Sequence, residues 1–325
     1  MKSMSFIPFI TFGKRFVKAL LPGFSPSFLR ANTSQFSALF PEKVRLVRVA
    51  SGFRFTEGPV WHHPAKHLLF SDIPTSTIYQ LFPDGHCSAF RNPSGHSNGL
   101  TFDHEGRLVA CELGNRRVTR TELNGDMTVL ADAFKGRKFN GPNDVVVKKD
   151  GSIYFTDPFY KKVSGVTPFE QEQPFQGVYK ISPGSREVLA LVSDFDKPNG
   201  LAFSPDETLL YIDDSSSRRH IRVFHVLPDG RLTNGRVFHD MRTQEKGNPD
   251  GMKLDREGNL YCTGPGGVWV LNRHGQHLGT IVTPEQPSNC AWGADDFRTL
   301  YITARTSVYS IRVKTPGENY ATSQS

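Results

Sequence analysis

A polar residue recurs six times along this 325-residue chain, ten or eleven residues before the centre of an apolar, strand-like run. The runs include HLLFSD, GSIYFTD and TLLYIDD, and each follows a turn rich in Gly, Pro, Asp or other charged residues. The run centres are separated by 40, 45, 56, 51 and 40 residues. A period of this length, built from strands, predicts an all-β fold, a six-bladed β-propeller. The recurring residues are Glu57, Asn98, Asn143, Asn199, Asp250 and Asn289.

The shared position of these six residues predicts a metal site. The innermost strand of each blade lines the central channel, so a residue at the start of every first strand is brought into one ring. Carboxylate and amide oxygens gathered there repel one another or lack partners unless a hard cation binds among them. An Asn or Asp at a strand start can also be a turn-former that bonds its own backbone, and this alternative stays open for Asn98 and Asn289.

Charge argues against a nucleic-acid partner. The chain has a net charge of +7, but residues 1–41 contribute +5 of it, which leaves only +2 for the rest. A nearly balanced propeller lacks the basic face with which proteins bind nucleic acid.

The first 45 residues are predicted to be a basic N-terminal extension, followed by the propeller over residues 46–314 and a C-terminal tail over residues 315–325. The apolar stretch SFIPFITF is too short to span a membrane and makes a poor secretory signal, so we expect no transmembrane segment and a cytoplasmic location. With KRFVKALL after it, the extension could be an amphipathic surface helix, a targeting peptide or an arm that closes the propeller. We favour an extension packed on the propeller or loosely attached to it. Nothing in the sequence assigns an oligomeric state.

Two patterns in the chain do not predict a site. The four cysteines have no C-x-x-C spacing, which argues against a zinc ribbon or a disulfide framework. Gly95–Gly99 matches the G-x-S-x-G pattern of serine hydrolases, but that motif needs a helix after the serine. Here a strand, a turn and another strand follow, so Ser97 is interpreted as a loop hydroxyl.

Four segments in order resemble one family. FTEGPVW, GPNDVVV with GSIYFTDPFY, PNGLAFSPD and NPDGMKLDREGNLY are similar to the SMP-30/gluconolactonase/LRE-like family. HSNGLTFDHEGRLVACELGNRRVTR resembles its bacterial gluconolactonase branch. The likeness extends from about Val44 to Val313. It implies a six-bladed propeller that hydrolyses sugar lactones to hydroxy acids with one divalent metal, commonly Ca²⁺.

Residue by residue, the resemblance assigns the metal ligands to Glu57 in EGP, Asn143 in GPND, Asn199 in PNGL and Asp250 in PDGM. It implies that Asn98 lies beside the metal, where it contacts either the substrate or a metal ligand, and it assigns no role to Asn289. Oxygen ligands suit Ca²⁺, with Mg²⁺, Mn²⁺ or Zn²⁺ as alternatives. Such a cation would polarise the carbonyl of a lactone, and Asp250 is the candidate general base for the attacking water.

Further candidates for contacts with sugar hydroxyls are loop or strand-end residues: His96, Glu112, Arg117 and Asp157. Glu112 could instead form a hairpin salt bridge, and Asp157 an Asp-Pro turn. Three other functions stay open: a phosphotriesterase-like metal-dependent hydrolase, a strictosidine-synthase-like propeller enzyme, and a non-catalytic propeller that binds a protein.

Overall fold

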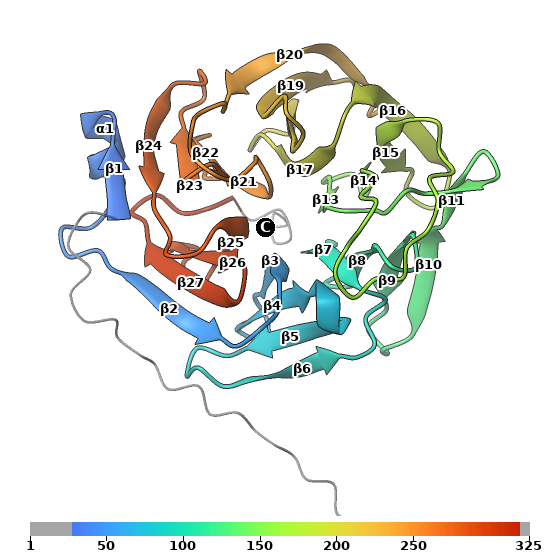
Figure 1. Ribbon diagram of the computed structural model, residues 1–325, viewed down its shortest axis with the longest axis horizontal. Coiled ribbons are helices and arrows are strands. Elements are labelled where there is room, and N and C mark those ends of the chain that lie inside the picture. The colour runs from blue at the N-terminus through green and yellow to red at the C-terminus, as the bar shows by residue number, and fades with distance from the viewer. Residues whose placement is uncertain (1–27, 319–325) are drawn as a thin grey trace, which may run out of the picture.

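Six antiparallel sheets stand around one axis in the computed structural model, which describes residues 28–318 (Figure 1). Within each sheet the chain runs from the axis outward, so that the first strand of every blade faces the channel. This arrangement confirms the predicted six-bladed β-propeller. No helix among residues 28–318 is long and apolar enough to cross a membrane.

The blades are numbered in chain order. Blade 1 contains β3 (Thr56–His62), β4 (His67–Asp72), β5 (Thr77–Leu81) and β6 (Cys87–Arg91). Blade 2 contains β7 (Ser97–Phe102), β8 (Leu108–Glu112), β9 (Arg117–Thr121) and β10 (Met127–Ala131). Blade 3 contains β13 (Val145–Val147), β14 (Ile153–Asp157), β15 (Gln176–Ile181) and β16 (Val188–Phe195). Blade 4 contains β17 (Pro198–Phe203), β18 (Leu209–Asp214), β19 (His220–Val226) and β20 (Leu232–Asp240).

Blades 5 and 6 each take a strand from the N-terminal part of the chain. Blade 5 contains β21 (Met252–Leu254), β22 (Leu260–Gly264), β23 (Gly267–Leu271), β24 (His277–Ile281) and, at its outer edge, β1 (Leu29–Ala31). Blade 6 contains β25 (Pro287–Gly293), β26 (Thr299–Ala304), β27 (Ser307–Arg312) and, at its outer edge, β2 (Leu46–Ser51). The remaining elements are helix α1 (Ser34–Ala38), the 3-10 helix η2 (Ile73–Thr75) and a hairpin of β11 (Ala133–Phe134) and β12 (Arg137–Lys138).

The hydrophobic core is divided among the gaps between blades. Each of the six gaps holds one cluster of buried side chains, and the second strands supply the centres of these clusters. Strand β4, for example, is buried along its whole length because neighbouring blades cover both of its faces. The continuous apolar runs in the sequence are these doubly covered strands.

The ring is closed by pairing between distant parts of the chain. Leu46 in β2 is paired with Ile311 in β27, and Leu29 in β1 is paired with Ile281 in β24. Phe36 of α1 is fully buried in the core between blades 5 and 6. Part of the predicted extension, residues 28–45, therefore packs on the propeller. SFIPFITF and KRFVKALL lie outside the described residues, and the proposed domain boundaries stay a prediction.

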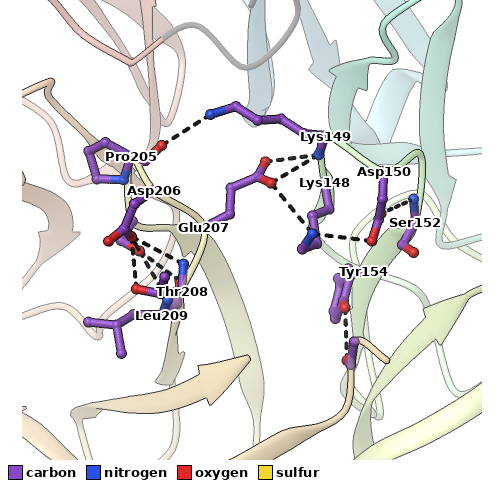
Figure 2. Close-up of polar contacts among 12 residues, drawn as sticks. Lys148, Lys149, Asp150, Ser152, Tyr154, Pro205, Asp206, Glu207, Thr208 and Leu209 are labelled. Atoms are coloured by element: carbon purple, nitrogen blue, oxygen red, sulfur yellow. Dashed lines mark hydrogen bonds and ion pairs between the residues drawn. The ribbon is translucent and has the colours of Figure 1, made fainter. Parts of the chain in front are cut away.

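Glu207 links blades 3 and 4 at the turns that follow their innermost strands (Figure 2). Its carboxylate accepts hydrogen bonds from the backbone N–H of Lys149 at 2.9 and 3.2 Å. The Lys148 Nζ lies 3.7 Å from the same carboxylate, and the Lys149 Nζ donates to the Pro205 carbonyl oxygen at 3.2 Å. Glu207 is buried, so these contacts tie the two turns together away from solvent.

Glu207→Ala is expected to lower the free energy of unfolding by about 1.5–3 kcal/mol, because a buried, charge-assisted hydrogen-bond acceptor is lost. Glutamate and alanine both carry a Cβ, so the backbone strain from the positive φ of residue 207 is nearly the same in the variant. Glu105→Ala is the control, since that carboxylate is 65% exposed and should cost less than about 0.5 kcal/mol. Urea unfolding measures both, and equal effects would contradict the role given to Glu207.

Candidate active site

One end of the channel opens into a cavity of about 540 Å³. Its lining comes from the starts of the innermost strands and from the loops above them. Five of the six residues predicted from the repeat line this cavity: Glu57, Asn98, Asn143, Asn199 and Asp250. They belong to five different blades, so the fold brings together side chains that are up to 193 positions apart in the sequence.

Glu57 is a buried carboxyl group and Asp250 a partly exposed one, and the charge of Glu57 disfavours the ionisation of Asp250. Desolvation by burial, opposed by the Gly58 N–H and assisted by the charge of Asp144, raises the pKa of Glu57 to about 7. Burial, and then the charges of Glu57, Asp213 and Asp144, raise the pKa of Asp250 well above its usual range. The site therefore gathers carboxyl groups at the end of the channel whose ionised form is disfavoured in the absence of a cation.

The amide of Asn199 is held in a defined orientation. Its Nδ2 donates to the Ser215 Oγ at 2.9 Å and to the Tyr160 hydroxyl oxygen at 3.2 Å. The Ser215 hydroxyl in turn donates to the Pro249 carbonyl oxygen, next to Asp250. Because the two amide hydrogens are engaged, the carbonyl oxygen of Asn199 is the atom left for a ligand.

Asn289 is buried and does not line the cavity. Its Oδ1 accepts from the N–H of Cys290 at 2.8 Å, and its Nδ2 donates to the Glu57 Oε2 at 3.2 Å. Glu57 Oε2 also accepts from the Gly58 N–H at 2.9 Å. Asn289 thus combines the backbone contact of a turn-former with the positioning of Glu57.

The four further candidates for substrate contact do not line the cavity. The His96 ring lies with its Nδ1 2.8 Å from the Ile73 carbonyl oxygen. Glu112 is buried and accepts from Arg117 Nε at 2.7 Å, which is the hairpin salt bridge considered above. Their direct contact with substrate stays a prediction, and these internal hydrogen bonds do not favour it.

Asp157 fixes the backbone of the loop that leads to Asn143. Its carboxylate accepts from the backbone N–H groups of Asn140 and Gly141 at 2.8 and 2.7 Å, just before Asn143. Asp72 accepts from the N–H groups of Arg54 and Phe55 in the same way. Asp214 repeats the contact with residues 196 and 197, ahead of Asn199.

Asp72 and Asp214 were not among the sequence candidates, and Asp157 was predicted as a substrate contact, although a signal for the shared role of all three was present. Asp72, Asp157 and Asp214 each end a second strand, in the runs HLLFSD, SIYFTD and LLYIDD. Each carboxylate fixes the loop that precedes the cavity-lining residue of its blade. A repeated carboxylate at the end of a buried strand was the pattern that could have identified them.

Ser97, in the G-x-S-x-G pattern, is fully buried at the start of β7, and its Oγ lies 2.9 Å from the Ser71 Oγ. Strand β8 follows β7, so the helix that a nucleophile elbow needs is replaced by a strand. Ser97 does not line the cavity.

Comparison with known proteins supports the resemblance. Residues 55–306 match the model of the SMP-30/Gluconolactonase/LRE-like region. The chain is 35% identical over 295 residues to a gluconolactonase of Zymomonas mobilis, which covers 83% of this chain and 81% of that protein. The structure of a gluconolactonase from Xanthomonas campestris matches with a TM-score of 0.82 at 31% identity, covering 88% of this chain and 94% of that one.

A more distant structure shares the fold alone. It is a calcium-binding protein, regucalcin, from Agrobacterium tumefaciens, with a TM-score of 0.68 at 20% identity, covering 84% of this chain and 96% of that one. With the six-bladed ring, the family model spans most of the chain, and the chain therefore belongs to the SMP-30/gluconolactonase/LRE-like family.

Proposed function

We propose that this protein is a metal-dependent lactonase that hydrolyses sugar lactones of the gluconolactone type to hydroxy acids. The observation that carries the proposal is the convergence of Glu57, Asn143, Asn199 and Asp250 on one cavity. The names of the Zymomonas and Xanthomonas relatives support the choice of substrate. A cytoplasmic location stays a prediction.

These four residues fit a divalent cation. The pKa values of Glu57 and Asp250 are both raised, so the ionised form of each carboxyl group is stabilised when a positive charge binds beside it. The donors that Glu57, Asn143, Asn199 and Asp250 offer are carboxylate and amide oxygens. Such an all-oxygen set favours Ca²⁺, and it is less suited to Zn²⁺, which takes nitrogen and sulfur ligands. Mg²⁺ and Mn²⁺ also accept oxygen ligands.

When bound, the cation would polarise the lactone carbonyl and lower the pKa of a water molecule. Asp250 would take the proton of the attacking water as general base. The water oxygen would form the new bond to the carbonyl carbon, the ring C–O bond would break, and Asp250 would return the proton to the ring oxygen, which leaves as a hydroxyl group. Glu57, Asn143, Asn199 and Asp250 would hold the cation, and Asn98, which also lines the cavity, would contact a substrate oxygen.

The cavity wall also contains apolar side chains. Phe55, Ile73, Pro74, Leu113 and Val163 contribute to its lining. They would cover the apolar face of a sugar ring and limit access of bulk water. A cavity of this kind orients a small ring through a few polar contacts.

The test is a pH-indicator assay on glucono-1,5-lactone and simple γ-lactones, with the spontaneous rate subtracted. Activity should disappear after chelation and return when Ca²⁺ is added. An enzyme that keeps its turnover in excess chelator would refute metal dependence. Activity on phosphotriesters but on no lactone would instead favour the phosphotriesterase-like alternative.

A further inference from the structure

Positive side chains without acidic partners surround the proposed active site. The cavity is lined by four cationic residues, Arg54, Lys162, Lys197 and Arg305, and by two carboxylates, Glu57 and Asp250. The lining therefore carries a formal charge of +2, with both negative charges at the proposed metal site. A divalent cation bound there would leave +4. We refer to the four cationic residues as the rim.

None of the four rim residues forms an ion pair with any residue in the described range 28–318. Arginines in other loops of this protein behave differently. Arg116 pairs with Glu172 at 2.8 Å, and Arg218 pairs with Asp196 at 2.9 Å. Asp196 is the neighbour of Lys197 in sequence, yet its carboxylate contacts another residue.

Several carboxylates that lie close to the rim residues in space are already engaged by backbone or hydroxyl donors. Asp72 accepts from the backbone N–H of Arg54, and Asp214 from that of Lys197. Glu285 accepts from Thr306, the residue after Arg305. The fold thus uses these acids to shape the loops and leaves the rim charges available to a ligand.

The rim residues come from different parts of the ring (Figure 1). Arg54 precedes β3 and Arg305 lies between β26 and β27, in adjoining blades, where the Thr56 N–H donates to the Arg305 carbonyl oxygen at 2.7 Å. Lys197 precedes β17 in blade 4, and its Nζ lies 5.3 Å from the centre of the Tyr160 ring. Lys162 belongs to the connection between β14 and β15. Positive charge therefore faces the cavity from more than one direction.

A cavity whose lining carries a net positive charge raises the local concentration of anionic ligands. Arginine and lysine are the side chains that recognise phosphate and carboxylate groups. An uncharged sugar lactone can accept hydrogen bonds from these side chains, but it carries no negative charge that would offset theirs. We propose that this active site is selective for lactones that carry a second, anionic group, a phosphate or a carboxylate, outside the lactone ring. This inference rests on the proposed lactonase function and narrows its substrate class.

The experiment compares three lactones at low ionic strength: uncharged glucono-1,5-lactone, 6-phosphoglucono-1,5-lactone and a glucarolactone with a free carboxylate. We expect kcat/KM for at least one anionic lactone to exceed that for the uncharged lactone by about tenfold or more. The advantage should shrink as salt is added, since salt screens charges beyond about 10 Å at 0.1 M. Whether the phosphate or the carboxylate is preferred distinguishes the two sources of charge.

Arg54→Gln and Lys162→Gln test the rim directly, because both side chains are exposed and neither stacks on an aromatic ring. Each change should lower the ratio of kcat/KM between the anionic and the uncharged lactone about fivefold or more, mainly through KM. Arg54→Lys should restore part of the ratio. Lys161→Gln is the matched control, since Lys161 is exposed and does not line the cavity. Equal losses for charged and uncharged lactones would overturn the proposal.

A binding measurement separates this inference from the proposed function. Calorimetry in Ca²⁺ compares gluconate, 6-phosphogluconate and glucarate, which share one carboxylate and differ in the second anionic group. Tighter binding of 6-phosphogluconate or glucarate, weakened by Arg54→Gln, supports the rim proposal even if no lactone is hydrolysed. Affinities equal to that of gluconate would overturn it, while activity on glucono-1,5-lactone would still support the lactonase.

Discussion

Asp250→Asn is expected to lower kcat for lactone hydrolysis by about 10³-fold, since loss of a general base costs roughly 10²–10⁴-fold. Asparagine keeps an oxygen at the proposed metal site but cannot accept the proton of the attacking water. The pH-indicator assay measures the loss, with the Ca²⁺ concentration raised until the variant is saturated. A variant that keeps more than a tenth of the wild-type kcat would show that another group removes the proton.

Asp255→Asn is the matched control for this experiment. Asp255 is a buried carboxylate of the same blade that accepts from Asn259 and does not line the cavity. Its substitution should lower the free energy of unfolding while kcat is retained. The pair of variants therefore separates loss of a buried carboxylate from loss of the proposed base.

The metal-free protein is expected to lose stability as pH rises from 5 to 8. The folded-state pKa of Glu57 is raised from 4.5 to about 7, so the native protein holds a proton that the unfolded chain releases at lower pH. The stability linked to this proton is present below pH 4.5 and is lost as pH rises through 7. The difference between the folded and unfolded pKa values of Glu57 alone corresponds to about 3 kcal/mol in the free energy of unfolding. The raised pKa of Asp250 acts in the same direction.

Urea unfolding in chelator at pH 5 and pH 8 measures this loss for the wild type and for Glu57→Gln. Glutamine has no proton to release, so the decrease between the two pH values should be smaller by about 3 kcal/mol in the variant. Ca²⁺ should stabilise the wild type more at pH 8 than at pH 5, because it binds the ionised carboxylates. An identical pH dependence in both proteins would contradict the burial of an ionisable Glu57 at this site.

The fold and much of the cavity could be predicted from the sequence because both follow from a repeat. A residue at the same position of each first strand must reach the same ring, which is why Glu57 and Asp250 line one cavity from different blades. Asn289 shares that position but not the cavity. Its side-chain amide forms hydrogen bonds with Cys290 and Glu57, and the position of a residue along a strand does not predict such hydrogen-bond partners.

Other features depend on contacts that no local pattern encodes. The pairing of Leu46 with Ile311 closes the ring between residues far apart in the chain. Arg54, Lys162 and Arg305 lie in loops of different length and sequence, without a repeated position. Their convergence on the cavity depends on the packing of those loops above the strands.

The central claim is that one divalent cation is held by Glu57, Asn143, Asn199 and Asp250 and is needed for turnover. Elemental analysis of the dialysed protein, with the hydrolysis rate measured on the same sample, tests it most directly. We expect one ion per chain in active protein, and loss of the ion and of activity together on chelation. Full activity in protein with fewer than about 0.1 ions per chain would contradict metal dependence, since a reaction that needs the metal cannot proceed in protein from which the metal has been removed.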